Sequence, residues 1–237
     1  MGKLGIYLLA NYPSKEVFLE AVQACQDLGV DFLEVGFPFS DPVADGDALE
    51  KAGQVVLKRG DGMDDFVESF KRARAIFQRD LYIMTYSNLV YSMGIATFAK
   101  RVGPCNGLIL ADLPLREIAS FEKGLKSADV PIIRFLTPES REEDITSALK
   151  GAKGFVYFVS KRGTTGGGFD LDEETREKIA HVRGRGVDVC IGFGIQSKRD
   201  FDLACSAADG AIIGTKAVAE LEKGIEAFKV FLKALKE

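Results

Sequence analysis

Histidine and tryptophan are the rarest side chains in this sequence. Among 237 residues there is one histidine, His181, and there is no tryptophan. His181 falls within a segment of helical period, residues 173–183, away from any expected strand end, so we expect it to be a surface or packing residue. A metal site built from several histidines is thereby excluded, and we expect no bound metal. Catalysis must then rest on carboxylates or on a lysine.

Paired cysteines, a basic stripe and long apolar runs are also missing. The four cysteines, Cys25, Cys105, Cys190 and Cys205, form no Cys-x-x-Cys pair, which favours reduced thiols and a cytoplasmic location. A net charge of −4, with lysine and arginine spread along the chain, argues against nucleic-acid binding. The apolar run Leu4–Ala10 is too short to span a bilayer, and no later run approaches that length, so we expect no membrane contact.

Short apolar runs alternate with longer segments of helical period along the whole chain. The runs predicted as strands are Leu4–Leu9, Phe32–Val35, Leu81–Thr85, Gly107–Ala111, Ile132–Leu136, Phe155–Val159, Asp188–Ile191 and Ala211–Ile213. Ser14 is the predicted N-cap of the first helix. The other predicted helices are Ala48–Arg59, Asp64–Gln78, Ile95–Arg101, Arg116–Ser127, Arg141–Lys150, Glu173–Arg183, Lys198–Ser206 and Ala217–Lys236. Eight such units predict an α/β fold with one domain, residues 1–237, as a (β/α)8 TIM barrel; an open sheet is the alternative. In a TIM barrel the active site lies at the C-terminal ends of the strands.

A lone glutamate, Glu34, interrupts the second apolar run, within LEVGFPFSDPVADGD (Leu33 to Asp47). Parallel strands are covered on both faces, so Glu34 is either a structural carboxylate held by a hydrogen bond or a general acid/base in an apolar pocket. Burial in such a pocket moves a carboxyl pKa toward neutrality. Of the aspartates that follow, Asp45 is the better candidate to point into the pocket, whereas Asp41 and Asp47 fit solvated turn residues equally well.

Glycines gather in the loops after the last three predicted strands. They lie in GTTGGG (Gly163 to Gly168), in GFG (Gly192 to Gly194) and at Gly214, which precedes Thr215 and the last helix. Loops at these positions of a barrel often bind phosphate through backbone N–H groups, so we expect a phosphorylated small molecule as substrate. Lys161 precedes the longest of these loops; it fits the anchor of a mobile lid better than a Schiff-base lysine.

Several stretches together resemble the alpha subunit of tryptophan synthase. The resemblance covers essentially the whole chain and is carried by LEVGFPFSDPVADGD, YSNLVYSMGI (Tyr86 to Ile95), LILADLPLRE (Leu108 to Glu117), VYFVSKRGTTG (Val156 to Gly166), GFGI (Gly192 to Ile195) and GAIIGTKAV (Gly210 to Val218). It implies a lyase of tryptophan biosynthesis, which cleaves indole-3-glycerol phosphate to indole and glyceraldehyde 3-phosphate.

The resemblance also implies roles for individual residues. Glu34 would transfer the protons, and Asp45 would bind the indole N–H and stabilise the charge on the protonated ring. Further residues would bind substrate (Tyr7, Tyr157 and Thr165) and its phosphate (Gly166, Gly194, Gly214 and Thr215). No cofactor is expected in this chain.

Asp41, Pro42 and Asn88 match loops that, in the family, meet a beta subunit carrying pyridoxal phosphate in a heterotetramer. Two positions differ from the family pattern: Asn11-Tyr12 stands where Gly-Asp is common, and Asp47 where proline is common. Two other hypotheses remain at this point. One is another phosphate-binding barrel enzyme, either a Schiff-base aldolase using Lys161 or a sugar-phosphate isomerase; the other is a non-catalytic ligand-binding subunit.

Overall fold

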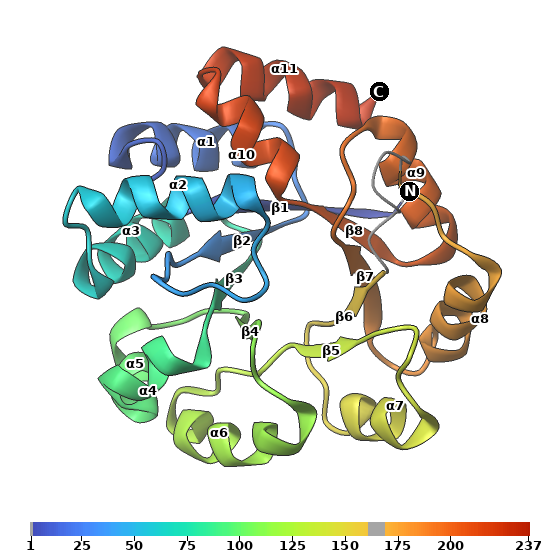
Figure 1. Cartoon of the computed structure of the whole chain (residues 1–237). Helices are drawn as coiled ribbons and strands as arrows, with labels where there is room; N and C mark the ends of the chain where they lie inside the picture. The colour runs from blue at the N-terminus through green and yellow to red at the C-terminus, as the bar shows by residue number, and fades with distance from the viewer. Residues whose placement is uncertain (1, 161–168) are drawn as a thin grey trace.

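Eight parallel strands form a barrel in the computed structural model, which describes residues 2–160 and 169–237 (Figure 1). They are β1 (Lys3–Leu9), β2 (Phe32–Gly36), β3 (Asp80–Thr85), β4 (Gly107–Leu110), β5 (Arg134–Leu136), β6 (Phe155–Val159), β7 (Asp188–Gly192) and β8 (Gly210–Ile213). Their order is β4-β3-β2-β1-β8-β7-β6-β5. The ring closes where the Leu108 N–H donates to the Pro131 carbonyl (2.8 Å) and the Ile133 N–H donates to the Leu108 carbonyl (2.9 Å). The predicted TIM barrel is confirmed, and the open sheet is wrong.

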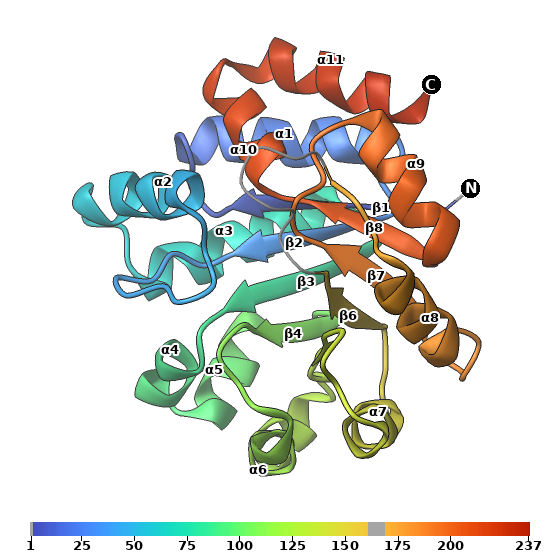
Figure 2. The same cartoon turned by 45° about the vertical axis from the view of Figure 1, so that its right-hand side comes forward.

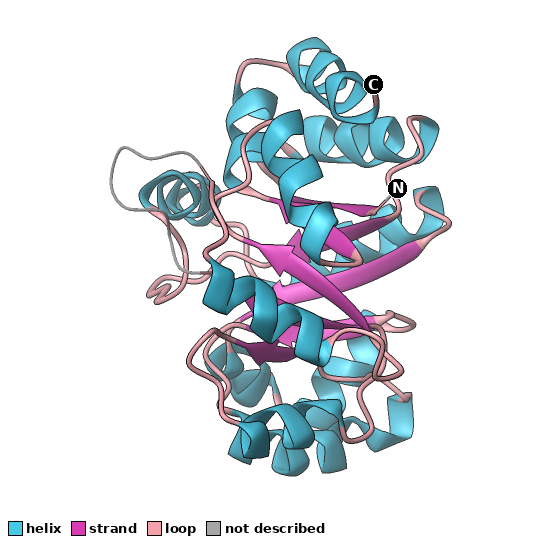
Figure 3. Cartoon of the chain, turned by 90° about the vertical axis from the view of Figure 1, so that its right-hand side faces the viewer, coloured by secondary structure: helices cyan, strands magenta, loops and turns pink. Residues whose placement is uncertain are grey.

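Helices surround the strands, as the side view in Figure 3 shows. They are α1 (Lys15–Asp27), α2 (Asp47–Lys58), α3 (Met63–Ile76), α4 (Ser87–Met93), α5 (Ile95–Val102), α6 (Ile118–Leu125), α7 (Glu142–Leu149), α8 (Glu173–Val182), α9 (Lys198–Ala207), α10 (Thr215–Glu222) and α11 (Ile225–Lys236). Short 3-10 turns, Leu115–Glu117 and Lys126–Ala128, flank α6. In the part of the chain that the structure describes, no helix is long and apolar enough to cross a membrane.

Local sequence explains some helix boundaries and misses others. Ser14 caps α1 as predicted, because its hydroxyl accepts a hydrogen bond from the Val17 N–H. The predicted helix Ala217–Lys236 is wrong, since Gly224 lies between α10 and α11 with a φ of 112°, a conformation that ends a helix. The sequence prediction also missed α4. Its first residue, Ser87, is bonded by Asp112 from the loop after β4, a contact that local sequence does not reveal.

Aromatic rings fill the amino-terminal half of the barrel. Phe32 on β2, Tyr82 on β3 and Phe155 on β6 are buried, and their ring centroids lie 5.1–5.8 Å apart. Packing across the barrel at these distances leaves no open channel between the rings. Figure 2 shows the arrowheads of β1 to β4 pointing to the side where α2 lies. That carboxyl-terminal side is where the barrel is hollow.

Candidate active site

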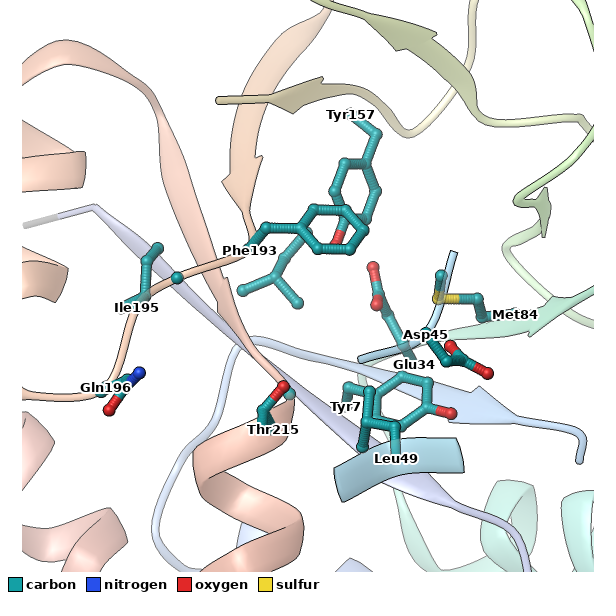
Figure 4. A pocket seen from close by; sticks show the side chains of 13 residues that line it. Tyr7, Glu34, Asp45, Leu49, Met84, Tyr157, Phe193, Ile195, Gln196 and Thr215 are labelled. Atoms are coloured by element: carbon teal, nitrogen blue, oxygen red, sulfur yellow. The ribbon is translucent and has the colours of Figure 1, made fainter. Parts of the chain in front are cut away.

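A cavity of about 110 Å³ opens at the carboxyl-terminal side of the strands (Figure 4). It is lined by Tyr7, Glu34, Asp45, Leu49, Met84, Tyr157, Phe193, Gly194, Ile195, Gln196, Ile212, Gly214 and Thr215. Among these described residues the two carboxylates, Glu34 and Asp45, are the charged side chains, and neither lysine nor arginine is present. The cavity therefore combines apolar walls with two acids, an arrangement suited to proton transfer.

Glu34 projects from β2 into this cavity. In the parallel register it stands between Tyr7 of β1 and Tyr82 of β3. Its side chain is 0% exposed, and in the described part of the chain neither carboxylate oxygen has a hydrogen-bond partner. Burial alone raises its pKa to about 8, because an ionised carboxylate is poorly solvated in apolar surroundings. A structural carboxylate would be held by hydrogen bonds, so the geometry favours a general acid/base at Glu34 over a structural role.

Two tyrosines form walls beside Glu34, each seated over a glycine of the neighbouring strand. Tyr7 packs over Gly36 and Tyr157 packs over Gly192, so closely that a Cβ on either glycine would overlap the tyrosine ring. Burial, followed by nearby carboxylates, raises the pKa of both hydroxyls well above the ordinary value. Both tyrosines thus stay neutral, and among the described residues that line the cavity Glu34 has no compensating cation.

Asp45 lies in the loop between β2 and α2, on the same side of the cavity as Met84 in Figure 4. It is half-buried, and its carboxylate accepts a hydrogen bond from the Tyr86 hydroxyl. Burial raises the pKa of Asp45, while the bond from Tyr86 lowers it. Asp45 is consequently a hydrogen-bonded acid at the cavity wall, in an environment unlike that of Glu34.

The opposite end of the cavity is built from backbone. Gly194, Gly214 and Thr215 line it, and Thr215 is the first residue of α10. No side chain of the described residues caps this helix, so its first N–H groups can bind an anion. Phe193 and Gly194 both have positive φ values, 80° and 81°, which turn the chain sharply after β7. Glu34 lies between this end and Asp45 in Figure 4.

Comparison with known proteins assigns the chain to a family. The sequence model described as "Tryptophan synthase alpha chain" matches residues 2–237. The chain belongs to the tryptophan synthase alpha chain family. The Bacteroides fragilis tryptophan synthase alpha chain is 34% identical over 98% of this chain and 91% of its own length. That of Methanosarcina mazei is 33% identical over 95% of this chain and 83% of its own.

Solved structures agree with this tryptophan synthase alpha chain assignment. A crystal structure of tryptophan synthase from M. tuberculosis contains a chain with a TM-score of 0.87 and 26% identity, covering 99% of this chain and 91% of that one. The tryptophan synthase α2β2 complex of Pyrococcus furiosus contains a chain with a TM-score of 0.88 and 27% identity, covering 100% and 99%. The resemblance stated from the sequence motifs is confirmed.

The structure of this tryptophan synthase alpha chain family member brings together most of the predicted site residues. Glu34, Asp45, Tyr7, Tyr157, Gly194, Gly214 and Thr215 all line the one cavity. Asp41 and Asn88 are exposed, Pro42 is partly exposed, and none of the three lines this cavity. Thr165 and Gly166, like Lys161, lie outside the described residues.

Sequence reasoning missed several lining residues, among them Met84, Phe193 and Ile212. Met84 and Ile212 could have been found from strand alternation, since each lies two residues beyond an inward-facing position of its strand, at Tyr82 and Gly210. Tyr86 was also missed as a partner of Asp45. No local pattern links these two residues, because they are 41 positions apart and meet only in the folded barrel.

Proposed function

We propose that this chain cleaves indole-3-glycerol phosphate to indole and glyceraldehyde 3-phosphate, as the family assignment implies. The observation that carries the proposal is Glu34: a fully buried carboxyl with no partner among the described residues and a pKa of about 8, in an aromatic cavity. A group with this pKa gives and takes protons efficiently near neutral pH. The family assignment favours this reaction over the other hypotheses from the sequence.

Glu34 would perform both proton transfers of the retro-aldol reaction. The indole carbon bonded to the glycerol chain must gain a proton, and the hydroxyl on the adjacent glycerol carbon must lose one as the carbon–carbon bond breaks. The protonated carboxyl of Glu34 would supply the first proton, and the resulting carboxylate would accept the second. The electron pair of the broken bond returns to the ring, so indole leaves neutral and the catalyst is regenerated.

Asp45 would bind the ring nitrogen. Protonation of the ring carbon places positive charge on that nitrogen, and a carboxylate that accepts its N–H hydrogen bond stabilises the charge where it develops. The free backbone N–H groups near Gly194, Gly214 and Thr215 would bind the phosphate at the other end of the cavity. Roles for Thr165 in binding substrate and Gly166 in binding phosphate rest on the family resemblance alone.

A beta subunit is the proposed partner. The complexes of M. tuberculosis and P. furiosus are tryptophan synthases that contain chains similar to this one. By analogy this chain would assemble into an α2β2 heterotetramer through the rim that carries Asp41, Pro42 and Asn88. Pyridoxal phosphate would be bound by the beta subunit, and this chain would need no cofactor. The free thiols of all four cysteines support a reducing, cytoplasmic setting.

The test is an indole-release assay with Glu34→Gln. Glutamine keeps the shape of the side chain but cannot transfer a proton, so we expect turnover to fall by roughly 10³-fold or more. The chain contains no tryptophan, so the protein adds no tryptophan emission to the indole signal. Circular dichroism checks that the variant is folded, and Glu68→Gln, at an exposed position of α3, is the control. Near-normal turnover by Glu34→Gln would contradict the proposal.

A further inference from the structure

Tyr86 connects the end of β3 to the loop that carries Asp45. It directly follows β3 and is 4% exposed. Its ring packs against Phe39 in the loop after β2, with centroids 5.2 Å apart. Its hydroxyl oxygen accepts a hydrogen bond from the Ala44 N–H (3.2 Å), and its proton is donated to the Asp45 carboxylate. One side chain thus fixes both the backbone of this loop and its acid.

Tyr86 is itself fixed by its neighbour in the chain. The N–H of Ser87 donates to one carboxylate oxygen of Asp112 (2.7 Å), and the Ser87 hydroxyl donates to the other (2.7 Å). Asp112 lies just beyond β4. The Tyr86-Ser87 dipeptide therefore connects the loops that follow β2, β3 and β4, and the rigid barrel holds it in place from two sides.

The hydroxyl of Tyr86 keeps its proton and can donate a hydrogen bond at any working pH. Burial, followed by the nearby Asp45, raises the pKa of Tyr86 to about 12, so the proton stays on the oxygen throughout the working pH range. A hydrogen bond donated to a carboxylate favours its ionised form. This bond opposes the burial that pushes the pKa of Asp45 upward.

We propose that Tyr86 is a positioning residue, which holds the Asp45 carboxylate and its loop in the place where the substrate's ring nitrogen binds. This inference rests on the proposed role of Asp45. Tyr86 is not among the residues that line the cavity, so it acts through the Asp45 carboxylate and its loop and not on the substrate directly. Its hydroxyl holds the Asp45 carboxylate in its binding geometry before substrate arrives, so the site does not have to reorganise on binding.

The first test compares Tyr86→Phe with Tyr91→Phe. The Tyr86 variant keeps the ring on Phe39 and loses only the hydroxyl. We expect kcat to fall about tenfold to a hundredfold, as for a lost hydrogen bond to a charged group, while KM changes less than about threefold. The acid limb of the pH–rate profile should move to higher pH. Tyr91, half-exposed on α4 against Phe121, should tolerate the same change. An unchanged kcat and pH profile would overturn the proposal.

Two further measurements separate positioning from general structure. On an Asp45→Ala background, Tyr86→Phe should add less than about a twofold effect, since the group through which it acts is gone; full additivity would contradict the inference. Carboxyl NMR titration of the free protein should show a higher pKa for Asp45 in Tyr86→Phe than in the unmodified chain. That titration does not depend on turnover, so it tests Tyr86 even if the proposed reaction were wrong.

Discussion

Glu34 is a residue whose burial costs stability. Below a pH of about 4.5 its carboxyl is neutral in both the folded and the unfolded chain. Between about 4.5 and about 8 the unfolded chain releases a proton that the folded chain retains, so the free energy of unfolding falls as pH rises through this window. Above about 8 both states are ionised and the loss is complete. The protein tolerates an acid here that its fold does not need.

Glu34→Gln should therefore be less sensitive to pH than the unmodified protein. The decrease in the free energy of unfolding between pH 5 and pH 9 should be smaller in the variant by roughly 3–4 kcal/mol, because the titrating group is absent. Urea denaturation at a series of pH values measures this difference. The exposed Glu68→Gln variant should follow the unmodified chain at every pH. Parallel pH curves for Glu34→Gln and the unmodified chain would show that Glu34 titrates normally.

At the scale of the element, the walls of the cavity depend on glycines within strands. Gly192→Ala in β7 would place a methyl group inside the ring of Tyr157 and force that wall to move. We expect a loss of about 1–3 kcal/mol in stability and a fall of about a hundredfold in kcat/KM. Gly53→Ala adds the same methyl group in α2, where the nearest atom is Pro38 Cβ at 3.8 Å, and should leave both quantities nearly unchanged. Thermal melts and indole release measure the two effects.

Local chemistry also accounts for Asn11 and Asp47, two residues that differ from the family pattern. Asp47 is the first residue of α2, where an acid interacts favourably with the helix dipole and where proline is equally suited. Asn11 has a φ of 62°, a left-handed conformation that suits glycine and that asparagine tolerates best among other residues. Its side chain donates to Asp61 and accepts from Ser69. Asn11 and Asp47 therefore fit their local backbone, whereas nothing in the structure explains Tyr12 in place of aspartate.

At the scale of the whole molecule, the sequence predicted the barrel and both acids of the cavity, whereas the lining residues Met84, Phe193 and Ile212 were missed. The period of two placed Glu34 inward, and the barrel brings Tyr7 beside it by register. What could not be predicted depends on contacts between distant loops. The bond from Tyr86 to Asp45 and the bonds from Asp112 that begin α4 join segments separated by 25 residues or more, and nothing in the local sequence of either partner specifies them.

The rim around the cavity should govern assembly. Asp41→Ala combined with Asn88→Ala removes two exposed polar side chains next to the mouth, and we expect binding to a beta subunit to weaken about tenfold while the fold is retained. Glu174→Ala with Glu177→Ala, exposed on α8, is the matched control and should bind normally. Calorimetric titration with a purified beta subunit measures both. Equal affinities for the two variants would place the interface elsewhere.

The aromatic rings of Phe32, Tyr82 and Phe155 close one end of the active-site cavity. Because they close the amino-terminal half of the barrel, substrate must enter and both products must leave on the carboxyl-terminal side. Glyceraldehyde 3-phosphate and indole therefore have to leave before the next substrate molecule can bind. A partner bound over this side of the barrel would therefore control both the entry of substrate and the release of products.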